Sequence, residues 1–242
     1  MIALLCSVQV EAELLLSKTT IAKSVIIGSK SIIHGTLAGH QILLCIGGMG
    51  KVNAAHATTL LLSQFNPHVL IVFGIGGAYP SSGAHVGDIA IANNEIAGDD
   101  GVMTTDGFRD AEYIGIPLIK TAKATMYTTY PAPEALVQRS LQALVSYDGL
   151  GAAQVHVGTF VTLSTCTGTT SQARSLENRY HGLCENMEGA AAAQVAELHN
   201  IPWLEVRGIS NIVEDRNLDT WDIPSAANSV QKAVIRLLSV FE

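Results

Sequence analysis

The sequence has few cysteines, and they are far apart, which excludes whole classes of site. Its 242 residues include Cys6, Cys45, Cys166 and Cys184, and no two of them form a Cys-x-x-Cys pair. Disulfide frameworks and zinc sites need closer or regularly spaced cysteines, and the eight histidines show no metal-ligand spacing either. We therefore expect reduced thiols in a cytoplasmic protein, with no metal and no cofactor.

Long apolar runs are also missing. The apolar residues come in runs of about 5 to 8, whereas a membrane span needs about 20 in a row. The first residues carry no basic stretch, and Gln9, Glu11 and Glu13 follow at once, so no signal peptide is expected. These features predict a protein that has no membrane partner.

Basic residues are scarce. There are 14 of them against 21 acidic residues, which gives a net charge of -7, and no Lys/Arg cluster could follow a phosphate backbone. Nucleic acid is therefore not an expected partner. What the chain does have is 48% apolar residues and a mean hydropathy of +0.31, enough to bury a large core. We expect one domain over residues 1–242.

The apolar pattern alternates between two periods. Short runs rich in Val and Ile predict strands over 2–6, 24–27, 42–46, 69–73, 86–92, 155–163 and 203–209. Amphipathic patterns predict helices near 9–17, 51–65, 133–147, 171–180, 188–200 and 224–241. This alternation predicts an α/β fold, a three-layer sandwich in which helices flank a mixed, largely parallel central sheet.

Two segments depart from this alternation. Residues 31–46 read as a hairpin that turns at 38–41. Residues 97–130 are the least periodic part of the chain, and a long irregular segment in an α/β domain more often covers a site or forms an interface than stays disordered.

A glycine-rich stretch, Gly47-Gly48-Met49-Gly50-Lys51, follows one predicted strand and opens a helix. Free backbone N–H groups and the helix dipole favour an anionic or strongly polar ligand there. The spacing is not that of a P-loop. Taken alone, the motif is equally consistent with a tight turn that needs glycine only for its geometry.

A second glycine motif, Gly74-Ile75-Gly76-Gly77, has the Gly-x-Gly spacing of a dinucleotide site. A helix should follow such a site, but residues 79–83 contain Pro80 and Gly83 and break a helix instead. We interpret these glycines as places where a flat ring can approach the backbone closely.

Three charged residues stand near predicted element ends. Glu11 follows the first strand and, by itself, reads as a solvated first-turn glutamate; a position at a strand end leaves a ligand-binding role open. Glu188 starts a helix of small residues; it could be an ordinary N-terminal glutamate, or its two oxygens could accept from vicinal hydroxyls. Arg207 lies inside an apolar run and must find a partner or a polar cavity.

Taken in order, four motifs resemble the purine nucleoside phosphorylase and nucleosidase superfamily from end to end. They are Gly-x-Gly-Lys-Val-x-Ala-Ala at 48–55, Gly-Gly-Ala at 76–78 with Val-Gly-Asp-Ile at 86–89, Met-Glu-Gly-Ala-Ala at 187–191, and Arg-x-Ile-Ser at 207–210. The chain is similar to methylthioadenosine/S-adenosylhomocysteine nucleosidases. It is most similar to the futalosine hydrolases, a likeness carried by residues 209–213, Arg216 and residues 221–223.

The resemblance implies roles for particular residues. Glu11 corresponds to the water-activating glutamate, Glu188 to the carboxylate that binds the ribose diol, and Arg207 would lie close to the nucleophile. Asn211 stands where the adenine-cleaving relatives carry aspartate, and a carboxamide suits a 6-oxo purine better than adenine. The expected catalytic residues are Glu11, Asn211 and Arg207, and the expected substrate-binding residues are Glu188, Met187, Gly76, Gly77, Gly50, Ser210, Thr165 and Cys166.

The implied activity is hydrolysis of the N-glycosidic bond of a purine nucleoside. Futalosine is the expected substrate, with hypoxanthine as the released base, in menaquinone biosynthesis. The alternatives are a methylthioadenosine/S-adenosylhomocysteine nucleosidase, a phosphorylase, in which Glu11 would repel phosphate, and a purine-binding protein without activity. No aromatic residue occurs over 164–169 to stack on the base, as one often does in the adenine-cleaving relatives.

Two features of the substrate site stay open from the sequence. Futalosine carries a carboxylate on its 5′ tail, and Arg216, Lys51 and Arg109 are equal candidates to meet it. In related nucleosidases a second subunit completes the 5′ pocket, so we expect a homo-oligomer, most simply a dimer, with residues 97–130 at the interface.

Overall fold

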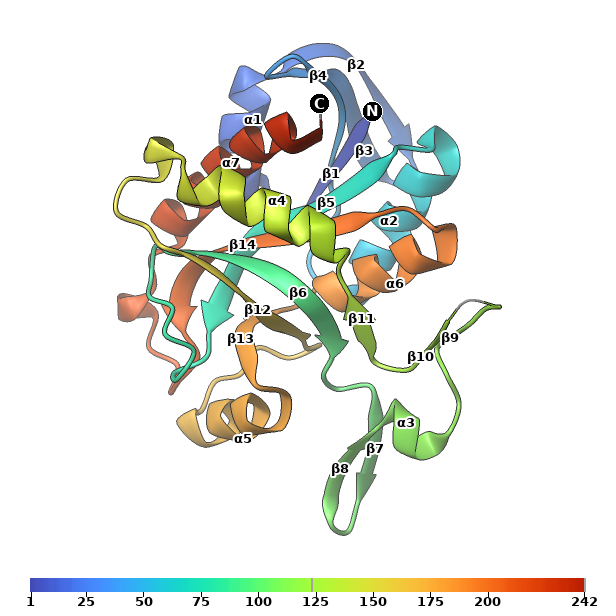
Figure 1. Cartoon of the computed structure of the whole chain (residues 1–242), viewed down its shortest axis with the longest axis vertical. Coiled ribbons are helices and arrows are strands. Elements are labelled where there is room, and N and C mark those ends of the chain that lie inside the picture. The colour runs from blue at the N-terminus through green and yellow to red at the C-terminus, as the bar shows by residue number, and fades with distance from the viewer. Residues whose placement is uncertain (123, 242) are drawn as a thin grey trace.

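The computed structural model describes residues 1–122 and 124–241, and a ten-stranded mixed sheet forms its centre (Figure 1). The strands of this sheet are β1 (Ile2–Cys6), β2 (Thr20–Ile27), β3 (Lys30–Leu37), β4 (His40–Ile46), β5 (Val69–Ala78), β6 (Ile89–Ala97), β11 (Thr129–Pro131), β12 (Val155–Thr162), β13 (Gly182–Asn186) and β14 (Trp203–Ile212). The helices are α1 (Glu13–Lys18), α2 (Lys51–Phe65), α3 (Ala111–Ile114), α4 (Glu134–Val145), α5 (Thr170–Tyr180), α6 (Gly189–His199) and α7 (Ile223–Leu237).

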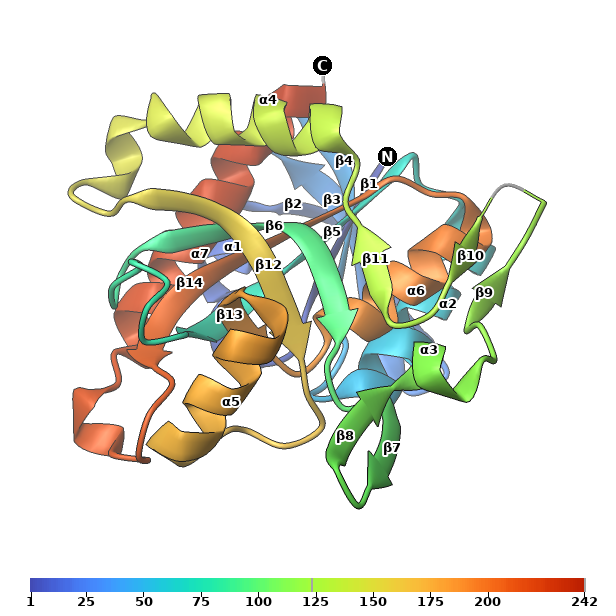
Figure 2. The ribbon, with the colours of Figure 1, turned by 60° about the horizontal axis from the view of Figure 1, so that its bottom comes forward.

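Helices cover the sheet on both faces, which confirms the α/β sandwich. Helices α2 and α6 pack on each other along one face, while α1, α4 and α7 lie together on the other (Figures 1 and 2). Parallel ladders join β1 to β4 and β5, β5 to β14, and β12 to β6 and β13. Antiparallel ladders supply the remaining pairings, so the sheet is mixed as predicted.

Strand β14 closes part of the sheet on itself. It pairs with β5 on one edge and with β6 on the other, while β6, β12, β13 and β5 follow one another in the sheet order. The five strands therefore form a closed ring of ladders. Because β1, β4, β5 and β14 run in the same direction, their carboxyl ends meet at one edge of the sheet, where α/β sheets bind ligands.

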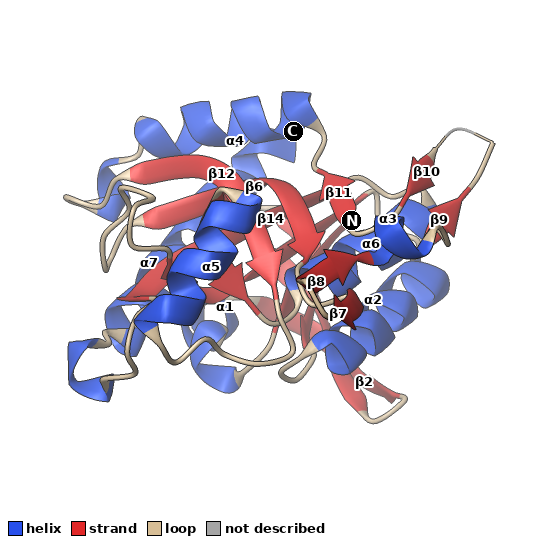
Figure 3. Ribbon diagram, turned by 90° about the horizontal axis from the view of Figure 1, so that it is seen from below, coloured by secondary structure: helices blue, strands red, loops and turns tan. Residues whose placement is uncertain are grey.

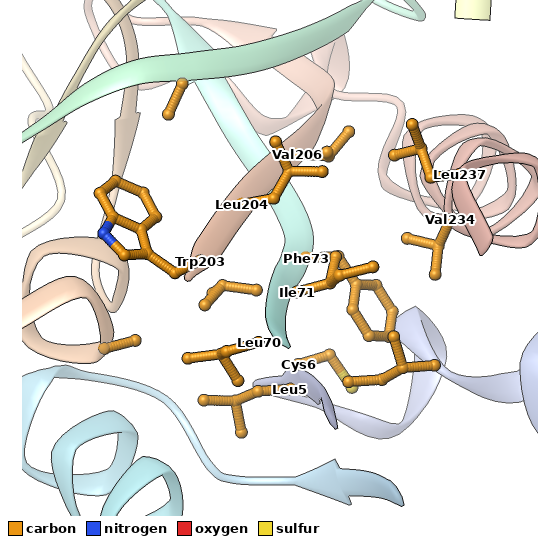
Figure 4. Close-up of a cluster of buried hydrophobic side chains, with 14 of the residues drawn as sticks. Leu5, Cys6, Leu70, Ile71, Phe73, Trp203, Leu204, Val206, Val234 and Leu237 are labelled. Atoms are coloured by element: carbon orange, nitrogen blue, oxygen red, sulfur yellow. The ribbon is translucent and has the colours of Figure 1, made fainter. Parts of the chain in front are cut away.

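The core lies between β5, β14 and the flanking helices. Figure 4 shows Val234 and Leu237 of α7 facing Ile71 and Phe73 of β5, and all four are buried. On the opposite side Trp203 is fully buried, and its Nε1 donates to Glu197 of α6 at 3.1 Å. This packing fixes the positions of β5 and β14, which carry several residues of the site described below.

The strand and helix predictions hold for most elements. The 31–46 hairpin is confirmed as β3 and β4, which pair antiparallel around a turn with Ala38 and Gly39 at positive φ. Residues 74–78, which we did not assign to a strand, continue β5, and no helix follows the glycines directly, as the pattern over 79–83 predicted.

Two strand predictions were wrong. The predicted strand 86–92 starts later, at Ile89, and runs to Ala97. Residues before it form a turn in which Gly87 has φ +96° and the Asp88 carboxylate accepts from the backbone N–H groups of His85 and Gln154. Strand β13 was missed because it is only five residues long and ends in two polar ones.

The irregular segment contains two small hairpins and a short helix. Strands β7 (Gly101–Thr104) and β8 (Gly107–Asp110) form the first, and β9 (Ile119–Lys120) and β10 (Thr125–Met126) form the second, with α3 between them. Figures 1 and 3 show that this arm extends away from the main sheet. Within the described residues, no helix has the length and apolar character that crossing a membrane requires.

Candidate active site

One cavity of about 280 Å³ collects most of the residues singled out in the sequence. Its walls come from the segments after β1 and β4, from β5, β13 and β14, and from the loops after β12 and β14. The lining residues are Ser7, Val8, Glu11, Met49, Ile75, Gly76, Gly77, Cys166, Thr167, Glu185, Asn186, Met187, Glu188, Arg207, Ser210, Asn211, Val213, Arg216 and Trp221.

Glu11 lies in the short 3-10 helix Gln9–Glu11, just after β1, and three backbone N–H groups hold its carboxylate. One carboxylate oxygen accepts from the backbone N–H groups of Ser7 at 2.8 Å and Val8 at 3.1 Å, and the other accepts from Ile75 of β5 at 2.9 Å. The side chain is buried, and this burial raises the pKa of Glu11, while Arg207 and the backbone donors oppose the rise. A buried carboxylate with a raised pKa is suited to general base catalysis.

Glycine at position 74 is needed for this arrangement. A Cβ atom on Gly74 would lie 2.5 Å from Glu11 Oε1 and 2.9 Å from an Arg207 guanidinium nitrogen. The two charged side chains therefore converge over the bare backbone of β5.

Arg207 is fully buried and completely enclosed by acceptors. Its Nε donates to Glu205 at 2.8 Å, and one terminal nitrogen donates to the Ile75 carbonyl at 3.1 Å and to Glu188 at 3.2 Å. The neighbouring carboxylates, Glu205 first, raise its pKa against the opposing effect of burial. Arg207 therefore keeps its charge and joins Glu188 to Glu11 electrostatically.

Glu188 stands at the start of α6, between β13 and the glycine-rich turn. Its Oε1 accepts from the backbone N–H of Gly50 at 2.8 Å, and its Oε2 faces Arg207. Gly50 has φ +92°, a backbone conformation that favours glycine. Gly50 thus orients Glu188 but does not itself line the cavity, whereas its neighbour Met49 does. Met187 also lines the cavity, beside Cys166, with their sulfur atoms 3.4 Å apart.

Asn211 lies on β14 and lines the cavity. Its Oδ1 accepts from the Ser210 hydroxyl at 2.8 Å, and its Nδ2 donates to the Ile212 carbonyl at 3.0 Å. A Cβ on Gly77 would meet Val213 at 2.8 Å and the Asn211 amide at 3.1 Å. The carboxamide therefore lies directly over the glycine backbone of β5.

Glu185 is a residue that the sequence reasoning missed. It is buried at the end of β13, where its carboxylate accepts from the Thr167 backbone at 2.8 Å, the Thr167 hydroxyl at 2.6 Å and the Tyr79 hydroxyl at 3.2 Å. Burial raises its pKa. In the sequence, Glu185 stands two residues before Met187, in a stretch where we predicted no strand. Its closeness to the Met187 motif is the signal that could have marked it as a site residue.

The loop after β12 meets the cavity through Cys166 and Thr167, while Thr165 is exposed and lies outside the lining. Met49 and Arg216 are exposed at the rim, with Val8 and Trp221 beside them, and the Arg216 guanidinium lies 4.8 Å from the centre of the Trp221 ring. Arg216 is the one of the three candidate tail cations that reaches this cavity.

The other two candidates are engaged elsewhere. Lys51 forms ion pairs with Asp99 and Asp100, which also raise its pKa. Arg109 lies on β8, with its guanidinium 6.0 Å from the centre of the Tyr113 ring. Neither residue lines the cavity.

The comparisons with known proteins define the class of protein to which this fold and site belong. A model of the phosphorylase superfamily matches residues 1–241, so the chain belongs to that superfamily. The chain is 29% identical to the 5′-methylthioadenosine/S-adenosylhomocysteine nucleosidase of Geobacillus thermodenitrificans, over 99% of this chain and 97% of the relative. It is 35% identical to the futalosine hydrolase of Streptomyces coelicolor, over 82% of this chain and 79% of the relative.

Solved structures agree with the fold. The 5′-methylthioadenosine/S-adenosylhomocysteine nucleosidase of Neisseria meningitidis, in complex with methylthio-immucillin-A, superposes with a TM-score of 0.83 at 23% identity, covering 98% of this chain and 97% of that one. The S-adenosylhomocysteine nucleosidase of Streptococcus pyogenes, in complex with 5-methylthiotubericidin, gives a TM-score of 0.84 at 23% identity, covering 100% and 97%.

Proposed function

We propose that this protein is a purine nucleosidase that hydrolyses the N-glycosidic bond with water. The observation that carries the proposal is that one cavity places the buried carboxylates Glu11 and Glu188 on either side of Arg207. Cleavage of a glycosidic bond passes through a cationic sugar, which nearby carboxylates stabilise.

Each group has a part in the proposed step. A water molecule attacks the anomeric carbon, and Glu11 accepts its proton. Glu188 accepts hydrogen bonds from the ribose diol and holds the sugar in place. The electron pair of the C–N bond passes to the departing base, where the Asn211 amide stabilises the developing negative charge. The base then takes a proton from solvent water, and Glu11 releases the proton that it accepted back to solvent, so that one water is consumed overall. The products are the free sugar and the free base.

The charges of the cavity favour water over phosphate as the nucleophile. The one buried guanidinium in the lining, that of Arg207, is already neutralised by Glu205 and Glu188. Glu11 occupies the end of β1 with its charge facing the same region. A phosphate dianion placed there would meet carboxylates at close range.

Asn211 supports a 6-oxo purine and thus futalosine as the substrate. Its carboxamide can donate to a 6-oxo group and accept from a ring N–H, whereas adenine presents an amino donor at position 6. Arg216 at the rim supplies a cation for a tail carboxylate. The 35% identity to the Streptomyces coelicolor enzyme agrees with this assignment.

A methylthioadenosine/S-adenosylhomocysteine nucleosidase is the second candidate, and the comparisons favour it over a futalosine hydrolase. Most of the relatives and the solved structures compared carry that name. The rim also offers an apolar surface from Val8, Met49 and Trp221, which would suit a methylthio tail.

Incubation with inosine, methylthioadenosine and futalosine in phosphate-free buffer separates these functions. Chromatography identifies the liberated base and sugar. We expect hypoxanthine from futalosine and free sugar without added phosphate. Faster release of adenine from methylthioadenosine would establish the second candidate, and dependence on phosphate would show a phosphorylase. Saturable binding of purines without any cleavage would indicate a binding protein.

A further inference from the structure

Glu185 is a buried carboxylate in the cavity wall that the proposed mechanism does not use. Its three hydrogen bonds, from Thr167 and Tyr79, all come from neutral donors. The other buried glutamates of the cavity differ in this respect, because Glu188 is paired with Arg207 and Glu11 lies beside it. Burying a carboxylate without a cation is costly, and such positions are often functional.

The sheet register places Glu185 and Asn211 on the two sides of one residue. Glu185 of β13 pairs with Gly77 from one edge of β5, and Asn211 of β14 pairs with Gly77 from the other edge. Neighbouring strands lie about 4.8 Å apart, so the two backbones are separated by about 10 Å across Gly77. Glu185, Gly77 and Asn211 all line the cavity, so a purine ring that enters it between the two polar side chains can meet both of them.

The two side chains would then meet adjacent edges of the same ring. Asn211 can face the edge with N7 and the substituent at position 6, while Glu185 faces the edge that begins at N1. Glu185 Oε1 accepts one hydrogen bond among the described residues, from the Thr167 backbone, and a carboxylate oxygen can accept two. An acceptor at this position fits the N1–H of a 6-oxo purine and opposes adenine, whose N1 is itself an acceptor.

We propose that Glu185 determines base specificity by accepting a hydrogen bond from N1–H of a 6-oxo purine, opposite Asn211. This inference rests on the proposed nucleosidase function and adds the residue that reads the second edge of the base. Anchoring of the loop after β12 through Thr167 is the structural role that competes with it.

The test compares Glu185→Gln with Thr167→Val. The first variant removes the charged acceptor, and the second removes a hydroxyl contact of the loop while leaving the carboxylate in place. We expect Glu185→Gln to lower the ratio of kcat/KM for inosine over adenosine by roughly 10- to 100-fold, the size of a lost hydrogen bond to a charged group. Thr167→Val should change that ratio by less than about 3-fold, because it leaves Oε1 intact.

Several outcomes overturn the proposal. An unchanged ratio in Glu185→Gln does so, and so does an equal fall in Thr167→Val, which would assign Glu185 to the loop alone. A wild-type preference for adenosine would also contradict it. If the wild type cleaves neither nucleoside, calorimetric binding of hypoxanthine and adenine to the wild type and to Glu185→Gln tests the base contact, and cleavage of futalosine or methylthioadenosine tests the proposed function separately.

A crystal of the wild-type protein soaked with hypoxanthine gives an answer that does not depend on any variant folding. We expect N1 within hydrogen-bond distance of the Glu185 carboxylate, about 2.7 to 3.2 Å. A ring bound with another edge toward Glu185 would reject the assignment.

Discussion

At the scale of single residues, carboxylates in one cavity are given different tasks by their neighbours. Within the described chain, the Glu11 carboxylate accepts hydrogen bonds from three backbone N–H groups, and its burial raises its pKa. Glu188 instead lies between the Gly50 backbone and the Arg207 guanidinium. A raised pKa suits a group that accepts a proton, and a carboxylate held between a backbone N–H and a guanidinium is oriented to accept hydrogen bonds from a diol.

Substitution of either carboxylate should therefore abolish most turnover. We expect Glu11→Gln and Glu188→Gln each to reduce kcat/KM by about 10²- to 10⁴-fold, because an amide neither accepts the proton nor carries the charge. Glu13→Gln, an exposed neighbour on α1, is the matched control and should retain activity. Steady-state kinetics on the folded variants measure these changes in kcat/KM. A near-normal rate in Glu11→Gln would contradict the role of Glu11 in activating water.

The pH dependence of the rate should report the same carboxylate. Glu11 acts as a base only when ionised, so kcat/KM should fall as the pH drops through its pKa. Because burial raises that pKa, the acid limb should lie above the ordinary glutamate value of about 4.3. A pH–rate profile measured from about pH 4 to 8 tests this, and full activity down to the ordinary value would contradict it.

Asn211 offers a test of base choice from the opposite edge of the ring. Asn211→Asp replaces a group that can donate with one that only accepts when ionised, so preference should move from inosine toward adenosine by about 10-fold or more. The measurement is the ratio of kcat/KM for the two nucleosides. Serine substitution at Thr165, which is exposed and outside the cavity lining, should leave the ratio unchanged.

At the scale of elements, strand β5 is both the centre of the sheet and the floor of the site. Its first residues, such as Ile71 and Phe73, are packed in the core, while Ile75, Gly76 and Gly77 line the cavity. Within this strand, bulky apolar side chains give way to glycines, which explains why the strand predicted from the sequence ended at residue 73. Glycine usually weakens a strand, but here the ladders to β13 and β14 and the close approach of other side chains hold it.

A methyl group on that floor should damage the site. We expect Gly74→Ala to lower kcat/KM by at least about 100-fold, because the new Cβ would displace Glu11 and Arg207 from their positions. Gly168→Ala is the control, since its Cβ would come no closer than 3.8 Å to the nearest neighbouring atom. Circular dichroism and kinetics on both variants separate loss of the site from loss of the fold.

At the scale of the whole molecule, the hairpin of β7 and β8 and the helix α3 stand apart from the sandwich, and this part of the arm exposes large apolar side chains. Met103 is 74% exposed, Tyr113 66% and Ile116 68%. An apolar surface of this kind is typical of an interface. A dimer formed through this arm remains a prediction. In that dimer a second copy of the chain would cover the exposed apolar surface.

Sedimentation or light scattering can test the dimer. We expect the wild type to sediment as a homo-oligomer, and Ile116→Asp to shift it toward the monomer by placing a charge in the interface. Val145→Asp, at an exposed apolar position on α4, is the matched control and should not change the mass. A monomeric wild type would contradict the prediction outright.

The sequence alone determined the alternation of strands and helices, the hairpin at 31–46 and the motifs at Glu11, Glu188 and Arg207, because periodicity and glycine spacing are local properties of the chain. It could not determine that Lys51 pairs with Asp99, that Arg216 reaches the cavity, or that Glu185 and Asn211 both pair with Gly77. These arrangements depend on which strands pair and in which register. The tertiary structure decides them, because residues far apart in the chain meet only when strands such as β14, which pairs with both β5 and β6 and packs against α7, take their places in the sheet.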